Sequence, residues 1–222
     1  PCSVEMPSKH GNLSLFIERL LCYVASRKQP AFDSKRSAAV LVCLFEGADG
    51  DIRVFLTRRS SNLSSYAGQV SLPGGKAEES DENYIETALR EANEEIGIDR
   101  HLVDVVAVLP PFFSKQGVQV VPVVGVLVDK EAYNPVLNPE EVESLFDAPL
   151  EMFLKDEDRR VEWITSNGEI YMFQLFDYKK GSENYVIWAF TAGILIFVAS
   201  VVYGRPPQFH VRNPPFWRTP KL

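Results

Sequence analysis

A glycine turn followed by an amphipathic, acidic helix constrains this chain more than any other segment, and it lies within residues 74–98. Gly74 and Gly75 supply the conformational freedom that a tight turn needs. After the turn, at 100° per residue, apolar side chains recur on one side of the predicted helix: Ile85, Leu89, Ala92 and Ile96. The segment is therefore expected to pack one helix face against a core.

Both ends of this helix are also predicted by the sequence. Ser80 is the expected N-cap, and Asp81 and Glu82 would place negative charge at the positive start of the helix. Gly97 suits a left-handed C-cap. The helix is expected to follow Ser80 directly and to end at Gly97.

Three glutamates flank the apolar stripe. Glu91, Glu94 and Glu95 stand at positions i, i+3 and i+4, so their side chains fall on one side of an α-helix. Clustered carboxylates repel one another unless a cation lies among them, and Mg²⁺ prefers such oxygen ligands, commonly together with a phosphate. A solvated acidic face is the simpler interpretation. However, the buried stripe places these glutamates at the edge of the core, which favours a cation site.

The segment resembles the Nudix box, the signature of the Nudix (MutT-like) hydrolases, written Gly-x5-Glu-x7-Arg-Glu-U-x-Glu-Glu-x-Gly-U with U apolar. The second half is matched position for position by Arg90, Glu91, Ala92, Glu94, Glu95, Gly97 and Ile98. In the first half the acid falls on Glu82, which leaves six residues after Gly75 instead of five. This insertion precedes the helix and is expected to lengthen the turn without moving the glutamates.

The resemblance implies a fold and a reaction. The fold would be α+β, an α/β/α sandwich around a mixed β-sheet, here with an N-terminal helix and an apolar C-terminal helix. The reaction would be hydrolysis of a diphosphate bond assisted by Mg²⁺ or Mn²⁺, ions that polarise a phosphoryl oxygen and activate a bound water. The implied metal ligands are Glu91, Glu94 and Glu95.

The resemblance also implies catalytic roles. Arg90 would orient the glutamates, because it can reach Glu86 one turn back and Glu94 one turn on. A general base is expected from a loop outside the box, for which Glu141 is the candidate. The implied catalytic set is Arg90, Glu94, Glu95 and Glu141.

The segment before the box narrows the range of expected substrates. Residues 56–75 are similar to the motif that precedes the box in coenzyme A diphosphatases, and the similarity extends over about residues 36–210, closest to the plant enzymes. Coenzyme A carries a diphosphate and a 3′-phosphate, anions that forked arginine donors suit. Tyr66 departs from this pattern, which usually has histidine there, so specificity or rate is expected to differ. The implied substrate-binding residues are Arg58, Arg59, Gly74, Gly75 and Lys76.

Two other functions compete with coenzyme A hydrolysis. One is a related Nudix hydrolase of ADP-ribose, NADH or a damaged nucleoside triphosphate, but no feature points specifically to ADP-ribose. The other is a non-catalytic Nudix-fold binding module, which is disfavoured because all three ligand glutamates are present. The expected partner is a small-molecule substrate, and a homodimer is left open.

Composition predicts one globular domain with a substantial core and argues against a nucleic-acid-binding surface. The 222 residues are 45% hydrophobic, and the net charge of −7 comes without a basic run. The odd number of cysteines (Cys2, Cys22 and Cys43), without CxxC spacing, predicts reduced thiols in an intracellular protein. The expected division is an N-terminal helical segment, a Nudix domain and a tail, at residues 1–35, 36–210 and 211–222.

The cellular location of the protein, including any association with a membrane, follows less directly from the sequence. Nineteen uncharged residues from Tyr185 to Tyr203 are long enough for a membrane helix, but small residues dilute their hydrophobicity, so we expect a buried helix. The terminal Pro220-Lys221-Leu222 is one residue away from the peroxisomal Ser-Lys-Leu signal. Because the chain begins at Pro1, a transit peptide could precede it, and mitochondrion, peroxisome and cytosol all stay open.

Further elements are expected from apolar periodicity. A helix is predicted over residues 13–28, strands over 38–45, 52–57, 69–72, 103–109 and 119–128, and a hairpin over 163–165 and 169–176.

Overall fold

The computed structural model describes residues 11–114, 117–166 and 169–212, without the side chains at positions 11, 12, 166 and 169. In chain order its elements are α1 (Gly11–Ala25), β1 (Ser37–Glu46), β2 (Ile52–Arg59), β3 (Val70–Ser71), β4 (Gly74–Lys76), α2 (Tyr84–Ile96), η1 (Arg100–Leu102), β5 (Val103–Val108), β6 (Phe112–Phe113), β7 (Gln119–Leu127), β8 (Val142–Pro149), η2 (Leu150–Leu154), β9 (Arg159–Ser166), β10 (Glu169–Lys180), β11 (Glu183–Trp188) and α3 (Ala189–Tyr203). The predicted first helix and strands are thus present, with ends shifted by a few residues.

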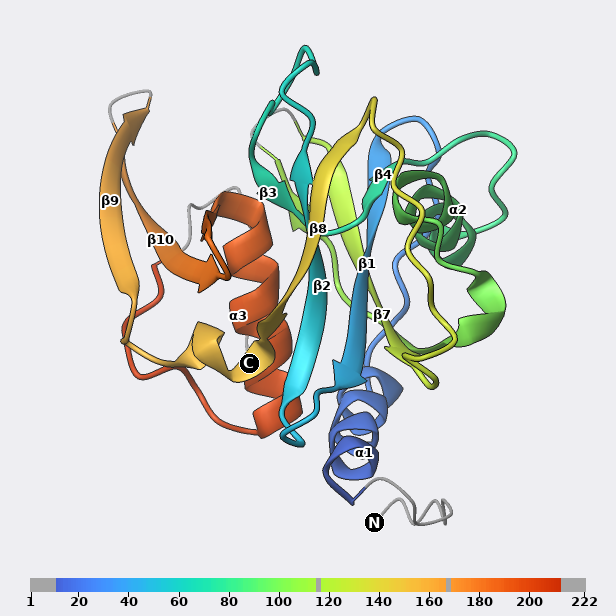
Figure 1. Cartoon of the computed structure of the whole chain (residues 1–222), viewed down its shortest axis with the longest axis horizontal. Helices are drawn as coiled ribbons and strands as arrows, with labels where there is room; N and C mark the ends of the chain where they lie inside the picture. The colour runs from blue at the N-terminus through green and yellow to red at the C-terminus, as the bar shows by residue number, and fades with distance from the viewer. Residues whose placement is uncertain (1–10, 115–116, 167–168, 213–222) are drawn as a thin grey trace.

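A mixed eight-stranded sheet forms the centre of the molecule (Figure 1). Its main path is β3-β2-β1-β7-β5, in which β1 and β7 are parallel and the other neighbours antiparallel. Three more strands extend this path: β4 pairs with β1, β6 with β7, and β8 with β2. The parallel neighbour of β1 is β7, which follows much later in the chain. The connection between these two strands therefore contains α2 and β5.

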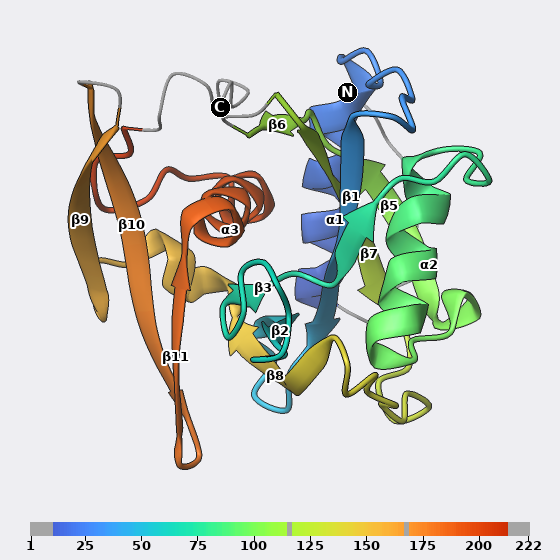
Figure 2. The same cartoon turned by 90° about the horizontal axis from the view of Figure 1, so that it is seen from above.

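Helices cover both faces of this sheet, with α2 on one face and α3 on the other (Figure 2). The apolar stripe of α2 packs on the residues of β1 that point to its side: Ala39, Leu41, Cys43 and Phe45. The intervening Val42 and Leu44 join the core beneath α1 and α3. These helices also contact each other, since the rings of Phe16 and Tyr203 lie 5.1 Å apart. The predicted α/β/α sandwich around a mixed sheet is confirmed.

A second, three-stranded sheet lies outside α3, in the order β11-β10-β9 (Figure 2). The predicted hairpin is confirmed as its β9–β10 part, where Trp163 stands opposite Met172. Its turn, residues 167–168, lies outside the described residues. β11 was not predicted as a strand, and it completes the sheet.

The apolar segment from Tyr185 to Tyr203 is a strand followed by a helix, so the prediction of one helix is wrong for its first part. Tyr185 and Ile187 are buried while Val186 between them is exposed, the period of two that a strand has. The helix begins at Ala189 and is buried almost throughout. A continuous apolar run does not distinguish these two structures, because both bury it. In the described part of the chain, no helix is both long and apolar enough to cross a membrane.

The start of α2 also differs from the prediction. Asn83 is the N-cap, and its Oδ1 accepts from the backbone N–H of Ile85 (2.9 Å) and of Glu86 (3.1 Å). Ser80 lies in the preceding turn and donates to Glu78 instead. The predicted C-cap is confirmed, because Gly97 has a φ of 68° and donates to Asn93 O. The longer turn thus moves the helix start three residues beyond the position expected from Ser80.

Two of the three cysteines are described, and both thiols are free, as predicted. Cys22 is exposed on α1, and Cys43 is buried in β1. Cys2 and the tail Pro220–Leu222 lie outside the described residues.

Candidate active site

The candidate site lies where β1 exchanges one neighbour for another. β1 pairs with β2 at residues 44–46 and with β4 at residues 38–40. Between these two stretches, Leu41 N donates to Pro73 O at 2.8 Å. The turn from β3 to β4 therefore lies where β1 separates from β2, directly beside Glu91 and Glu95 of α2.

Two positions in this turn require glycine. Gly74 has a φ of 147°, and a Cβ there would collide with Ala39 O and the Cα of Val40. A Cβ on Gly75 would overlap the carboxylate of Glu91. The absence of a side chain thus lets the turn lie against β1 at Gly74 and against Glu91 of α2 at Gly75.

Glu95 is the most deeply buried carboxylate of the site, with 1% of the residue exposed. Its Oε2 accepts from Gly74 N at 3.1 Å, and its Oε1 lies 3.8 Å from Nη1 of Arg59. Burial raises the pKa of Glu95 to about 7, although the Gly74 N–H and the Arg59 charge act in the opposite direction. A negative charge at this position is therefore poorly compensated by the protein alone.

Glu91 is also inside the site, whereas Glu94 lies at its rim. The Glu91 side chain is 15% exposed and that of Glu94 is 53% exposed. Burial raises the pKa of Glu91; Arg90 lowers it, while Glu94 and Glu141 raise it further. The predicted i, i+3, i+4 cluster thus contains two inward carboxylates and one at the surface.

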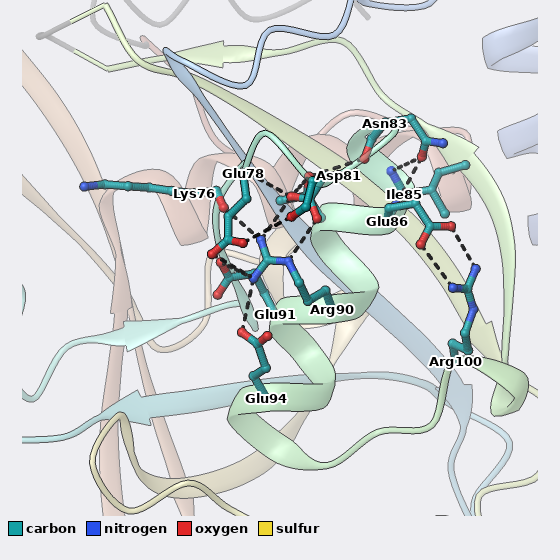
Figure 3. Close-up of polar contacts among 12 residues, drawn as sticks. Lys76, Glu78, Asp81, Asn83, Ile85, Glu86, Arg90, Glu91, Glu94 and Arg100 are labelled. Carbon is teal, nitrogen blue, oxygen red and sulfur yellow. Dashed lines mark hydrogen bonds and ion pairs between the residues drawn. The ribbon is translucent and has the colours of Figure 1, made fainter.

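Arg90 connects this cluster to the turn before α2 (Figure 3). Its Nε donates to Asp81 Oδ1 at 2.9 Å, and its Nη2 donates to Asp81 Oδ2 at 3.0 Å and to Lys76 O at 3.1 Å. Its Nη1 donates to Glu91 Oε1 and Glu94 Oε2, both at 3.1 Å. Each of the five N–H groups of the guanidinium therefore has an acceptor.

The predicted contact between Arg90 and Glu94 is confirmed, but the one with Glu86 is wrong. Glu86 accepts instead from Arg100, at 2.8 and 3.0 Å (Figure 3). The reason is that Arg90 turns toward the loop containing Asp81, which leaves the Glu86 carboxylate free to accept from Arg100 at the start of η1.

The two neighbouring arginines at the end of β2 point to different places. Arg59 faces Glu95, and its Nε is buried without a hydrogen-bond partner in the described part of the chain. Arg58 donates to Asn184 O at 2.6 Å, and its guanidinium lies 4.4 Å from the ring centre of Tyr185. The structure thus brings Arg59 to the glutamates and holds Arg58 against β11.

The remaining predicted residues are Glu141 and Lys76. Glu141 lies just before β8, close enough to raise the pKa of both Glu91 and Glu95. Asn138 holds this segment against α2, because its N donates to Glu95 O at 3.0 Å and its Nδ2 to Glu141 at 3.3 Å. The side chain of Lys76 is exposed and extends away from the Arg90 cluster (Figure 3).

The glutamates fit a divalent cation by their chemistry. In the described residues, no group of three or more acidic, histidine or cysteine side chains is already gathered as a metal site. Arg90 takes one oxygen each from Glu91 and Glu94. Nevertheless, Glu91 and Glu95 are buried carboxylates whose pKa values are raised by burial and by repulsion from neighbouring carboxylates. A hard cation would relieve both effects, and carboxylate oxygens are its preferred ligands.

Sequence reasoning missed Asp81 as a member of this site. We expected it at the start of the helix, but it precedes Asn83 and binds Arg90. Arg90 holds the pKa of Asp81 well below its usual range, at about 2. The one-residue insertion was the available signal: with five residues between it and Gly75 the box acid is Asp81, whereas with seven residues between it and Arg90 the box acid is Glu82.

The fold and this arrangement of Arg90 and glutamates define the class. The NUDIX domain profile matches residues 35–167, and the chain belongs to the Nudix family of hydrolases. Enzymes of this family generally use divalent metal ions. The prediction of a Nudix hydrolase is therefore confirmed at the level of the family.

Named relatives share most of this chain. It is 58% identical over 197 residues to Nudix hydrolase 15, mitochondrial, of Arabidopsis thaliana, covering 89% of this chain and 68% of the relative. It is 59% identical to Nudix hydrolase 22, chloroplastic, of the same plant, covering 81% of this chain and 59% of the relative. A peroxisomal coenzyme A diphosphatase of Mus musculus is 30% identical over 213 residues, covering 95% of this chain and 89% of the relative.

Proposed function

We propose that this protein hydrolyses the diphosphate bond of coenzyme A or its thioesters, with Mg²⁺ or Mn²⁺ as cofactor. Water adds to one phosphorus and the bridging P–O bond breaks, giving 3′,5′-ADP and (acyl-)phosphopantetheine. The observation that carries the proposal is the pair of buried carboxylates, Glu91 and Glu95, beneath the Gly74-Gly75 backbone and beside Arg59. A cation and a diphosphate together supply the charges that this site leaves uncompensated.

Different residues are proposed to bind the metal ion and the substrate phosphates. Glu91, Glu94 and Glu95 would hold the ion, which when bound polarises a phosphoryl oxygen and acidifies a water. Arg59 would donate to a phosphate oxygen, since its Nε has no acceptor in the described residues. Gly74 and Gly75 would contact the substrate phosphate through their backbone, because the turn packs directly against β1 and Glu91 and so lies beside the proposed metal ligands.

Glu141 is the proposed general base. It lies outside the box helix, near enough to Glu91 and Glu95 to affect their pKa values, and so within the same charged site. Asn138 orients its carboxylate. A carboxylate in this position would take the proton of the attacking water.

The proposal of coenzyme A as the substrate rests on similarity to coenzyme A diphosphatases. Residues 56–75 are similar to the motif of coenzyme A diphosphatases. The mouse relative that carries this activity in its name aligns with 95% of this chain. Lys76 is proposed as a further contact to substrate phosphate, because its exposed ammonium group follows directly on the glycine turn.

The proposed location is intracellular, and an organelle is favoured by similarity. The three relatives are named as mitochondrial, chloroplastic and peroxisomal proteins. Fluorescent tagging of the full-length protein, with co-staining for each organelle, would test this.

Product analysis tests the proposed reaction. The purified protein is incubated with Mg²⁺ or Mn²⁺ and separately with coenzyme A, acetyl-coenzyme A, ADP-ribose, NADH and 8-oxo-dGTP, and products are identified by mass spectrometry. Dominant 3′,5′-ADP and phosphopantetheine would support the proposal. Preferential cleavage of another diphosphate would contradict the substrate, and Tyr66, exposed in place of the usual histidine, would be examined first. No turnover of any substrate would favour a binding module.

A further inference from the structure

Asp81, and not the neighbouring Glu82, is the acid of the turn that pairs with Arg90. Glu82 has the spacing of the box acid, with seven residues between it and Arg90, yet its side chain is exposed. In the described part of the chain Glu82 makes no hydrogen bond or ion pair. Asp81 is instead buried and pairs with the guanidinium through both of its oxygens (Figure 3).

The carboxylate of Asp81 is itself held firmly. Besides Arg90, it accepts at 2.9 Å from Glu78 N, in the turn, and at 2.9 Å from Thr87 Oγ1, on α2. It therefore joins the turn, the first part of α2 and the arginine. A two-point contact with a fixed carboxylate also fixes the plane of a guanidinium.

The fixed plane determines where the other N–H groups of Arg90 point. Nη1, at the far side of the guanidinium from the Nε–Nη2 edge that binds Asp81, donates to Glu91 and Glu94. We infer that Asp81 is a positioning residue for the metal-binding glutamates and acts on them through Arg90. The inference rests on the proposed function to the extent that these glutamates hold a metal ion.

Asp81→Asn tests this, with Glu82→Gln as the matched control of equal charge change one residue away. Mn²⁺ affinity is measured by calorimetry without substrate, and kcat and KM are measured with the best substrate. We expect Asp81→Asn to weaken Mn²⁺ binding and lower kcat by about tenfold each, with KM little changed, because loss of such outer contacts typically costs 10–100-fold. Glu82→Gln should stay within about twofold of wild type. Wild-type Mn²⁺ affinity in Asp81→Asn would overturn the inference, as would equal losses in both variants.

A double-mutant cycle tests whether Arg90 transmits the effect. If Asp81 acts through Arg90, Mn²⁺ binding by the double variant Asp81→Asn/Arg90→Gln should be no weaker than by Arg90→Gln alone. Losses that add would overturn the inference. Should Asp81→Asn fail to fold, as judged by circular dichroism, Thr87→Val removes one donor to Asp81 and should weaken Mn²⁺ binding about threefold; unchanged affinity there would overturn it.

These outcomes are separable from those of the proposed function. Wild-type protein that binds no Mn²⁺ would overturn the inference together with the metal site. Wild-type protein that binds Mn²⁺ but leaves coenzyme A intact would remove only the substrate assignment, and the Mn²⁺ affinities of the variants would then decide about Asp81.

Discussion

At the scale of single residues, Glu91, Glu94 and Glu95 differ in burial, although helical spacing places all three on one side of α2. Glu95 accepts from the Gly74 N–H deep in the site, and Glu91 lies against Gly75. Glu94 is half exposed and gives one oxygen to Arg90. Glu91 and Glu95, the two inward glutamates, have lost hydration through burial and are repelled by neighbouring carboxylates, and a bound cation would offset both effects. Glu94 can be replaced without disturbing the core.

Glu94→Gln is therefore expected to lower metal-dependent turnover by about 100-fold while leaving the fold intact, because it removes the charge of one proposed metal ligand at the exposed rim of the site. Turnover is measured over a range of Mg²⁺ concentrations, and folding by circular dichroism and thermal unfolding. Unchanged turnover with a native melting temperature would contradict the metal assignment.

Arg59 and Arg58 provide a matched pair for substrate binding. Arg59→Ala should raise KM for coenzyme A about tenfold, because a hydrogen bond to a charged group contributes about 1.5–3 kcal/mol. Arg58→Ala should change KM less and lower the melting temperature, since Arg58 is bound to Asn184 and Tyr185. Steady-state kinetics and thermal unfolding of both variants check this. A larger KM effect from Arg58 would reverse the two roles.

At the scale of elements, the start of α2 shows how tertiary contacts choose between two good caps. Ser80 and Asn83 are both suitable N-cap residues by type. The contact of Asp81 with Arg90 keeps the preceding turn non-helical, so that Asn83 caps the first helical N–H groups. This start, together with the predicted C-cap at Gly97, sets the length of α2.

Asn83→Ala should destabilise the protein by about 1 kcal/mol, the usual cost of a lost N-cap. Ser80→Ala should change the free energy of unfolding by less than about 0.5 kcal/mol, because Ser80 is exposed and outside the helix. Urea unfolding of the two variants measures the difference. Equal destabilisation, or a larger effect at Ser80, would contradict the observed helix start.

At the scale of the whole molecule, charged residues tie the second sheet to the first. Asp147 on β8 binds Arg53 on β2 and Lys180 on β10, and Arg53 also donates to Tyr178 of β10 at 3.0 Å. Beside this cluster the rings of Phe146 and Tyr185 stack at 3.7 Å. The β10–β11 hairpin is thus anchored along β2, by Arg53 near the start of the strand and by Arg58, which lies against Tyr185, near its end.

This anchor should weaken in acid. Burial acts to raise the pKa of Asp147, but hydrogen bonds and charges from Lys180 and Arg53 prevail and lower it below the ordinary 3.8. The unfolded chain then binds more protons near pH 4, so the stabilisation by Asp147 is complete above that pH and is lost as pH falls through the folded-state pKa. Wild type should therefore exceed Asp147→Asn in stability at pH 6, and the difference should shrink between pH 4 and pH 3. Urea unfolding across this range measures it, and a constant difference would contradict the linkage.

The sequence by itself determined the parts of this protein that depend on local spacing. The box residues, the apolar stripe of α2 and the Gly97 cap follow from the order of side chains along one helix, because helical geometry relates residues three and four apart. Helical spacing also predicted the contact of Arg90 with Glu94. The alternating pattern of two short strands predicted the β9–β10 hairpin, and the resemblance of the box to that of the Nudix family implied the sandwich.

Only the tertiary structure decided between alternatives that local spacing leaves equal. It turned the first part of the last apolar run into β11, because a partner strand was available in β10. It directed Arg59 to Glu95 and Arg58 away from it, since successive residues at a strand end point in different directions. It also chose Asp81 over Glu82 as the partner of Arg90, because that choice depends on the path of the turn between β4 and α2, where no repeating geometry relates one residue to the next.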